Sequence, residues 1–255
     1  MSHAVSLLQN QQFIVIVPAA GVGKRMLATQ PKQYLMLNNQ CILTHTVNRL
    51  LSHKNITRVV LALSDEDAYF AQTTLAQNPK VTRVSGGKER VDSVLSGLQT
   101  IDDNAWVLVH DAARPCVAHE DIDKLIAQCL LNNSGGILGV PVVDTMKRTT
   151  SCNKKQKVMV KQTIERSHLW HAFTPQMFKA QELKHAIEQA KINNIDITDE
   201  SSAMEAAGLP SLMVLGRRDN IKITRPEDLA LASFYLTQQT LAPPVSGQQT
   251  SQGKE

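Results

Sequence analysis

The sequence predicts an α/β fold, built on a mostly parallel β-sheet with helices on both of its faces. Short aliphatic runs alternate along the chain with segments of helical periodicity. Aromatic residues make up only 4% of the chain, so the core must consist mainly of Val, Ile, Leu and Ala, as in buried parallel strands. At 255 residues the chain is long enough to bury one sizeable core.

The first half of the chain contains the elements of such a sheet in order. Three aliphatic runs are typical of buried strands, at residues 13–17, 59–63 and 106–109. Helical patterns cover residues 42–51, 65–76, 89–101 and 119–131, and a further strand is expected at 136–142. This alternation indicates right-handed crossover connections and a Rossmann-like sheet. In such sheets the ligand binds at the carboxyl ends of the strands.

Residues 143–163 interrupt the alternation with a polar and basic segment, which contains M-K-R-T-T-S-C-N-K-K-Q-K-V-M-V. Two short extended pieces flanking S-C-N-K-K would form a protruding β-hairpin, and a long structureless loop is the alternative. Beyond it, helices are expected at 181–190, at 198–207 and from Pro226, and strands at 212–215 and 221–224. Thr198 is the expected N-cap of its helix, without a capping box because position 201 is Ser.

We expect a single domain over residues 13–237, with flexible termini at 1–12 and 243–255. Four cysteines without a C-x-x-C pair indicate free thiols in a reducing compartment. The sequence contains no secretory signal and no run as long as a membrane span, which predicts a cytoplasmic protein without a membrane partner. The net charge is only +4, and the basic residues are mostly scattered, so no nucleic-acid partner is expected.

The first strand leads into P-A-A-G-V-G-K-R-M at residues 18–26. Small residues let backbone N–H groups approach a phosphate chain, and Lys24 and Arg25 add positive charge. The segment is not a Walker A loop, because Lys24 is followed by Arg25 instead of Ser or Thr. It also lacks the third glycine of the Rossmann fingerprint, since position 26 is Met. We therefore interpret it as a phosphate loop of another kind.

Three further motifs accompany this loop. P-K-Q at 31–33 places another cation nearby, and G-G-K-E-R at 86–90 opens a helix. Asp111 follows the strand at 106–109, where a carboxylate suits Mg²⁺, although a turn or cap role is the alternative. The segment D-N-I-K at 219–222 adds a lysine near the C-terminus, and whether its Asp219 shares the metal is left open.

Eight motifs in order carry a resemblance: P-A-A-G-V-G-K-R-M, P-K-Q-Y, G-G-x-x-R-x-x-S-V, V-H-D-A-A-R-P, D-T-M-K-R, L-W-H-A-F-T-P-Q, T-D-E-S-S-A and N-I-K-I-T-R-P-E-D-L. The chain resembles the 2-C-methyl-D-erythritol 4-phosphate cytidylyltransferases of the non-mevalonate isoprenoid pathway over residues 13–235. The resemblance implies a reaction in which the phosphate of methylerythritol phosphate attacks the α-phosphorus of CTP and pyrophosphate leaves.

The resemblance also implies the roles of individual residues. The nucleotide-binding residues would be Ala19, Ala20, Gly21, Gly23, Gly87, Arg90, Ser93, Asp111 and Ala112. The catalytic cations would be Arg25, Lys32, Lys222 and Arg166. The residues that bind the acceptor would be Arg114, Thr145, Arg166, Thr174 and Thr198. Asp111 would hold the cofactor, Mg²⁺ or another divalent cation.

Family members exchange an arm equivalent to residues 143–163 between two subunits. The resemblance therefore implies a homodimer in which Thr145 and Arg166 serve the partner's active site. Two features depart from the family pattern. Lys88 stands where other members carry an acidic residue, and the arm is longer and more basic.

The chemistry fits these residue types. A phosphate monoester has a second pKa near ~6, so the acceptor is largely a dianion at neutral pH and needs no general base. Cations and Mg²⁺ bring two polyanions together by positioning and charge neutralisation. Two alternatives remain: a cytidylyltransferase that acts on ribitol 5-phosphate, and a non-catalytic nucleotide-binding protein. The acceptor-side residues favour methylerythritol phosphate over ribitol 5-phosphate.

Overall fold

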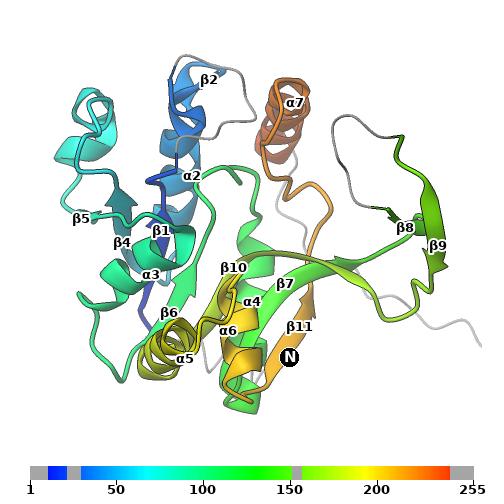
Figure 1. Cartoon of the computed structure of the whole chain (residues 1–255). Coiled ribbons are helices and arrows are strands. Elements are labelled where there is room, and N and C mark those ends of the chain that lie inside the picture. Colours follow the sequence, from blue (N-terminus) through cyan, green and yellow to red (C-terminus); the bar gives the residue numbers. More distant parts are fainter. Residues whose placement is uncertain (1–10, 22–29, 151–156, 242–255) are drawn as a thin grey trace, which may run out of the picture.

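The computed structural model describes residues 11–21, 30–150 and 157–241. Its centre is a seven-stranded sheet in the order β11-β7-β10-β6-β1-β4-β5 (Figure 1). The strands are β1 (Phe13–Pro18), β4 (Ile56–Leu63), β5 (Val81–Ser85), β6 (Trp106–Val109), β7 (Gly135–Pro141), β10 (Trp170–Lys179) and β11 (Ser211–Leu215). Apart from Gln11 and Gln12, the termini predicted to be flexible lie outside the described residues.

The sheet is mostly parallel, as predicted. β1 pairs in parallel with both β4 and β6, and β7 pairs in parallel with β11. β10 runs antiparallel to its two neighbours, β6 and β7. The chain moves from β1 outward to β4 and β5 and then returns to the other side of β1 with β6. The boundary between β1 and β6 is therefore the switch point at which α/β sheets bind ligands.

Helices cover both faces of the sheet because alternate side chains of each strand point to opposite faces. Val15 and Val17 of β1 belong to a core cluster with α2 (Ile42–Leu51) and α4 (His119–Asn132). Ile16 points the other way, into a cluster with α3, α5 and α6. Those helices span Arg90–Leu98, Ala180–Ile192 and Glu200–Ala206. The domain is thus a three-layer sandwich.

A third, smaller cluster lies beside the sheet. It packs α7 (Glu227–Leu241) against a two-stranded ribbon of β2 (Met36–Leu37) and β3 (Gln40–Cys41). The short helix η2 (Lys32–Tyr34) precedes that ribbon. This cluster therefore supports the segment that carries the P-K-Q motif.

Two predicted elements are wrong. The helix expected at 65–76 is replaced by two short 3₁₀ turns, η3 (Phe70–Gln72) and η4 (Thr74–Gln77). The Asp67 carboxylate accepts hydrogen bonds from the N–H groups of Tyr69 and Phe70, so it stabilises a local turn in place of a helix. The strand expected at 221–224 is also absent from the described sheets.

β5 and β10 were not predicted from the sequence, and one helix cap lies one residue from its predicted position. The N-cap of α6 is Asp199, not Thr198, and it forms a capping box with Ser202. The prediction failed because it started the helix one residue too early. As a result, Glu200 is the first residue of α6, and its side chain turns into the core.

The β-hairpin alternative for residues 143–163 is confirmed. β8 (Met146–Thr149) and β9 (Val160–Ile164) pair antiparallel, with Met146 opposite Ile164. Figure 1 shows this arm projecting from the body of the domain at the end of β7. Residues 151–156, between the two strands, lie outside the described residues.

Candidate active site

A cleft lies where β1 and β6 end, at the switch point of the sheet. It encloses about 620 Å³ of space including its open mouth. The lining residues are Pro18, Ala19, Ala20, Gly21, Lys32, Gln33, Gly87, Lys88, Glu89, Arg90, Ser93, Asp111, Ala112, Ala113 and Lys222. The structure thus brings together most of the residues predicted for the nucleotide. Gly23 and Arg25 lie outside the described residues.

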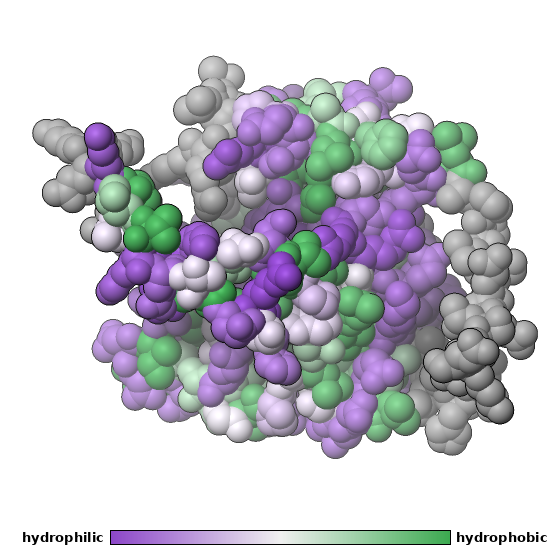
Figure 2. Space-filling view, turned by 90° about the vertical axis from the view of Figure 1, so that its right-hand side faces the viewer, coloured by the Kyte–Doolittle hydropathy of each residue, from purple (hydrophilic) through white to green (hydrophobic). Residues whose placement is uncertain are grey.

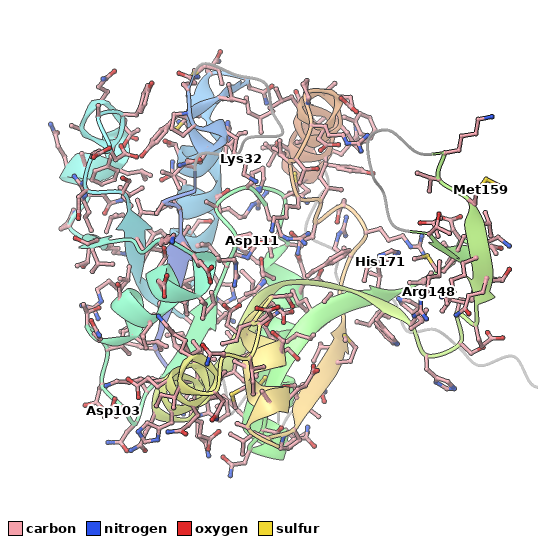
Figure 3. All side chains as sticks on the ribbon, viewed as in Figure 1. Lys32, Asp103, Asp111, Arg148, Met159 and His171 are labelled. Atoms are coloured by element: carbon pink, nitrogen blue, oxygen red, sulfur yellow. The ribbon has the colours of Figure 1, made fainter. Side chains whose placement is uncertain are left out.

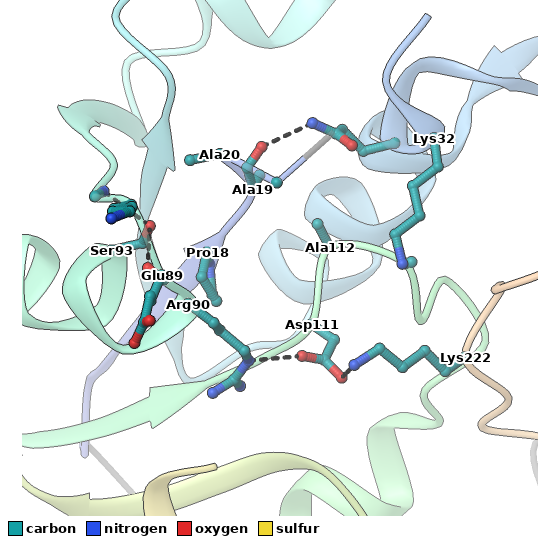
Figure 4. A pocket seen from close by; sticks show the side chains of 15 residues that line it. Pro18, Ala19, Ala20, Lys32, Glu89, Arg90, Ser93, Asp111, Ala112 and Lys222 are labelled. Atoms are coloured by element: carbon teal, nitrogen blue, oxygen red, sulfur yellow. Dashed lines mark hydrogen bonds and ion pairs between the residues drawn. The ribbon is translucent and has the colours of Figure 1, made fainter. Parts of the chain in front are cut away.

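The loop after β1 is tied to the P-K-Q segment by a buried hydrogen bond. The Gln33 side chain is 3% exposed and donates from Nε2 to the carbonyl of Ala19 over 2.7 Å. A buried amide bonded to a backbone carbonyl holds that carbonyl in one place. Gln33 therefore positions the small residues at the cleft and also anchors neighbouring Lys32 (Figure 4). The sequence analysis quoted Gln33 only as part of its motif and assigned it no role.

The G-G segment forms the opposite wall, pressed against the same loop. A Cβ atom added to Gly86 would lie 2.4 Å from Cβ of Ala20, and one on Gly87 would lie 2.0 Å from Cβ of Asp92. Both glycines are needed because a side chain would collide with its neighbours. The Ser93 hydroxyl accepts a hydrogen bond from the N–H of Gly87 and so orders this wall from α3.

Asp111 occupies the centre of the cleft floor and is surrounded by cations. Its carboxylate lies 2.9 Å from Nζ of Lys222, 3.2 Å from Nε of Arg90 and 3.3 Å from Nε of Arg114. Burial by itself would raise the pKa of Asp111, but the three positive charges outweigh it and hold that pKa well below its usual range. Figure 4 shows Arg90, Asp111 and Lys222 in a row, with Lys32 extending toward them. The carboxylate is therefore ionised at neutral pH, as a ligand for a hard cation must be.

Arg90 has a second partner that the sequence analysis did not identify. Glu200, only 2% exposed, accepts hydrogen bonds from Nη1 and Nη2 of Arg90 over 2.5 and 3.1 Å. Acidic residues are common in the first turn of a helix, so nothing in the local sequence distinguished Glu200 from a surface residue. The nearby carboxylates together raise the pKa of Arg90, against the opposing effect of its burial.

A second pocket of about 510 Å³ adjoins the first. Its lining consists of Arg90, Asp111, Arg114, Ala172, Phe173, Thr174, Gln176, Thr198, Asp199 and Lys222. Arg90, Asp111 and Lys222 line both pockets and form a common wall. The lining is polar and carries three of the residues predicted to bind the acceptor: Arg114, Thr174 and Thr198.

Two of the three residues predicted to bind the acceptor are fixed in place by their neighbours. The Arg114 guanidinium lies over the Phe173 ring, 4.8 Å from its centroid, and donates to the carbonyl of Asn220. Thr174 is 4% exposed, and its hydroxyl accepts from the N–H of Asp111. Thr174 therefore also fixes the backbone that presents Asp111.

Other predicted residues are not at this site. Thr145 and Arg166 line neither pocket, because they lie at the base of the arm, where Arg166 donates to the carbonyl of Val143. In Figure 3 the labelled arm residues Arg148 and Met159 lie well apart from Lys32 and Asp111. Asp219 pairs with Arg217, 2.6 Å away, and does not line either pocket beside Asp111.

Within residues 11–21, 30–150 and 157–241, no group of three or more His, Cys, Asp or Glu side chains is arranged to hold a metal ion. In the same ranges, no helix has the length and apolar character needed to cross a membrane.

Comparisons with known proteins agree with this geometry. The family model for 2-C-methyl-D-erythritol 4-phosphate cytidylyltransferase matches residues 13–238. The enzyme of that name from Colwellia psychrerythraea is 59% identical, with 89% of this chain and 96% of the relative covered. The one from Vibrio atlanticus is 53% identical, with 90% and 97% covered.

Solved structures show the same similarity in three dimensions. The crystal structure of Francisella tularensis 2-C-methyl-D-erythritol 4-phosphate cytidylyltransferase has a TM-score of 0.74 at 33% identity, covering 88% of this chain and all of the other. A crystal structure of 4-diphosphocytidyl-2C-methyl-D-erythritol synthase has a TM-score of 0.75 at 32% identity, with 89% and 99% covered.

The Rossmann-like sheet, with a cation-rich cleft at its switch point, defines a nucleotidyltransferase. Within that class, the chain belongs to the 2-C-methyl-D-erythritol 4-phosphate cytidylyltransferase family. The resemblance drawn from the eight sequence motifs is confirmed.

Proposed function

We propose that this chain joins CTP and 2-C-methyl-D-erythritol 4-phosphate to give 4-diphosphocytidyl-2-C-methyl-D-erythritol and pyrophosphate. The observation that carries the proposal is the wall shared by the two pockets. Arg90, Asp111 and Lys222 face both the cleft at the end of β1 and the adjoining polar pocket. A donor in one and an acceptor in the other would meet at this wall. Cations there would neutralise the two phosphate groups as they approach in line.

The larger cleft suits the nucleotide. Ala19, Ala20 and Gly21 would present backbone to the triphosphate, and Gly23 and Arg25 stay part of the proposal although they lie outside the described residues. The wall of Gly87, Ser93 and Ala112 would bound the base and ribose. Lys32 and Lys222 would stabilise the charge that develops at the α-phosphorus.

We assign Asp111 as the protein ligand of Mg²⁺. Its carboxylate is ionised, lies at the boundary of both pockets and offers the hard oxygen that this ion prefers. Mg²⁺ commonly takes one or two carboxylates together with substrate phosphates and water, so a single carboxylate suffices. Held at Asp111, the ion would supply positive charge that offsets the charge of the phosphates. Lys222, now 2.9 Å from Asp111, would turn toward the reacting phosphates.

The smaller pocket suits the acceptor, with Arg114, Thr174 and Thr198 as its ligands. The acceptor phosphate is already a dianion, so no residue of the chain has to remove a proton. His110, beside Asp111, fits this view. Burial lowers its pKa to about 4, and its Nε2 is bonded to the carbonyl of Arg114, so it is a neutral structural group.

We propose that the arm completes the acceptor pocket of a second copy of the chain, with Thr145 and Arg166 contributed across a homodimer. Six large apolar side chains on or beside the arm are more than a third exposed: Val143, Met146, Val158, Met159, Val160 and Leu169. Apolar exposure of this kind is typical of a surface that associates. Figure 2 views this side of the molecule and shows apolar residues interspersed among hydrophilic ones.

A cytoplasmic site of action accords with the free thiols of Cys41, Cys116 and Cys129.

Pyrophosphate release tests the reaction. Purified protein with CTP and Mg²⁺ is given methylerythritol phosphate or ribitol 5-phosphate, and Lys32→Ala is compared with Lys80→Ala. Lys80 is exposed and immediately precedes β5, so it lies where that strand begins, whereas the cleft lies where the strands end. We expect release with methylerythritol phosphate, reduced roughly 10²–10³-fold in Lys32→Ala alone. A preference for ribitol 5-phosphate would overturn the acceptor, and CTP binding without release would favour a binding protein.

Mixing two inactive variants tests the arm. Asp111→Asn disables the central site, and Arg166→Ala disables the arm. If arms are exchanged, a mixed dimer has one site with both defects and one site with neither. Mixing should therefore restore up to about a quarter of the wild-type rate, whereas a chain whose arm serves its own site would give no recovery.

A further inference from the structure

Glu200 is a buried acid that binds Arg90, a residue in the lining of both pockets. It is the first residue of α6, and the two residues before it, Thr198 and Asp199, line the smaller pocket. Glu200 itself lines neither pocket, is 2% exposed and accepts hydrogen bonds from both terminal nitrogens of Arg90. A buried carboxylate engaged on both oxygens is held in a defined position.

Arg90 is the residue through which Glu200 reaches the site. While its terminal nitrogens bind Glu200, its Nε donates to Oδ1 of Asp111 over 3.2 Å. Arginine favours two parallel hydrogen bonds to one carboxylate. Here it makes only one to Asp111, because Glu200 engages the other end of the guanidinium. Glu200 therefore limits how strongly Arg90 occupies Asp111.

The balance of positive and negative charges around Asp111 leads to the same conclusion. Arg90, Arg114 and Lys222 contact Asp111, so Glu200 is the second negative charge among three positive ones. Without Glu200, three cations would share one carboxylate. Their field would oppose a divalent cation there, and the freed end of Arg90 could pair fully with Asp111.

We propose that Glu200 is a positioning residue that holds Arg90 back from Asp111 and so keeps this carboxylate available to the divalent cation that accompanies CTP. The inference rests on the proposed function, because it takes Asp111 as the metal ligand. Glu200, on α6, is in the lining of neither pocket. Through Arg90, this residue also connects the helix beside the acceptor pocket to the donor cleft.

Calorimetry with CTP tests the proposal without turnover. The affinity for CTP is measured with Mn²⁺ and again with EDTA, and the ratio is the gain that the metal supplies. Glu200→Gln keeps the shape of the side chain and removes its charge. We expect the gain to fall roughly 10- to 100-fold, as for other partners that orient metal ligands, while the affinity in EDTA stays within about threefold. Glu205→Gln, an exposed position on the same helix, should behave as wild type.

A second substitution separates positioning from a merely structural ion pair. If Glu200 acts through Arg90, removing Arg90 as well should restore the metal gain. Glu200→Gln with Arg90→Met should therefore show a larger ratio than Glu200→Gln alone, even if CTP binds more weakly overall. A structural defect would give no such recovery.

The outcomes separate this inference from the proposed function. If the wild-type chain binds CTP no more tightly with Mn²⁺ than with EDTA and releases no pyrophosphate, the proposed function itself is contradicted. A normal wild type together with an unchanged gain in Glu200→Gln would overturn the role of Glu200 alone. Should Glu200→Gln fail to fold, Glu200→Asp decides. It keeps the charge but is one methylene shorter, and a gain equal to wild type would equally reject the proposal.

Discussion

Replacing Gly86 by alanine should lower the catalytic rate because of one steric contact, between the new Cβ atom and Ala20. A Cβ atom at this position would lie 2.4 Å from Cβ of Ala20 and 3.1 Å from both the Leu63 carbonyl oxygen and the Ser93 hydroxyl. The Ser93 hydroxyl can rotate away, but the Leu63 carbonyl belongs to strand β4 and cannot. Gly86 and the loop carrying Ala20 must therefore move apart.

The required shift can be worked out from the contact. Carbon atoms pack at about 3.5–4.0 Å, so the two walls must separate by at least ~1 Å. A 1 Å misplacement in an active site can lower the rate about 10²-fold, which corresponds to ~2.7 kcal/mol of activation free energy. We therefore expect kcat/KM for CTP to fall roughly 100-fold in Gly86→Ala. Overpacking should also lower the free energy of unfolding by about 1–3 kcal/mol.

The assay is continuous pyrophosphate release, with circular dichroism to confirm that the variant is folded. Gly216→Ala is the matched control, because its Cβ would meet its nearest neighbour, Asp121, at an ordinary 3.5 Å. Gly216 also lies outside both pockets. A folded Gly86→Ala variant with kcat/KM within threefold of wild type would refute the reasoning that the close approach of these two walls shapes the cleft.

Three further predictions follow from single contacts. Lys222→Met should lower kcat roughly 10²–10³-fold in steady-state kinetics, because it removes a cation from the shared wall. Burial raises the pKa of Cys116 and Cys129 from 9.0 to about 12, so site-resolved mass spectrometry at pH 8 should find their alkylation at least ~10³-fold slower in the folded than in the unfolded protein. The hydrogen bond from Lys191 lowers the pKa of Asp92 in the folded protein. The ionised Asp92 carboxylate therefore stabilises the fold at any pH above the unfolded pKa of ~3.9, and this stabilisation is lost as the pH falls through the folded pKa. Thermal unfolding should accordingly show Asp92→Asn to be about 1 kcal/mol less stable at pH 7, a difference that persists down to about pH 4 and is lost as the pH falls further, through the folded pKa of Asp92.

Much of the fold could be predicted because its main signals are local. The aliphatic runs at β1, β4 and β6 and the helix α2 lie where the sequence analysis placed them. Such patterns report burial directly, since a strand covered on both faces has to be apolar throughout. β10 lacked this signal, because its first residues are partly exposed. The false helix at 65–76 failed because Asp67 makes side-chain hydrogen bonds that periodicity does not register.

The sequence by itself determined the family and pointed to most of the residues that line the cleft. Small residues after β1, the G-G segment before α3 and Asp111 after β6 occur in motifs whose order alone identifies the chain. Only the tertiary structure decided how their charges are paired. Arg90 and Glu200 are 110 positions apart, and neither segment by itself indicates that the two side chains pair. Their pairing arises because α3 and α6 cover the same face of the sheet, and a buried charge has to find an opposite one.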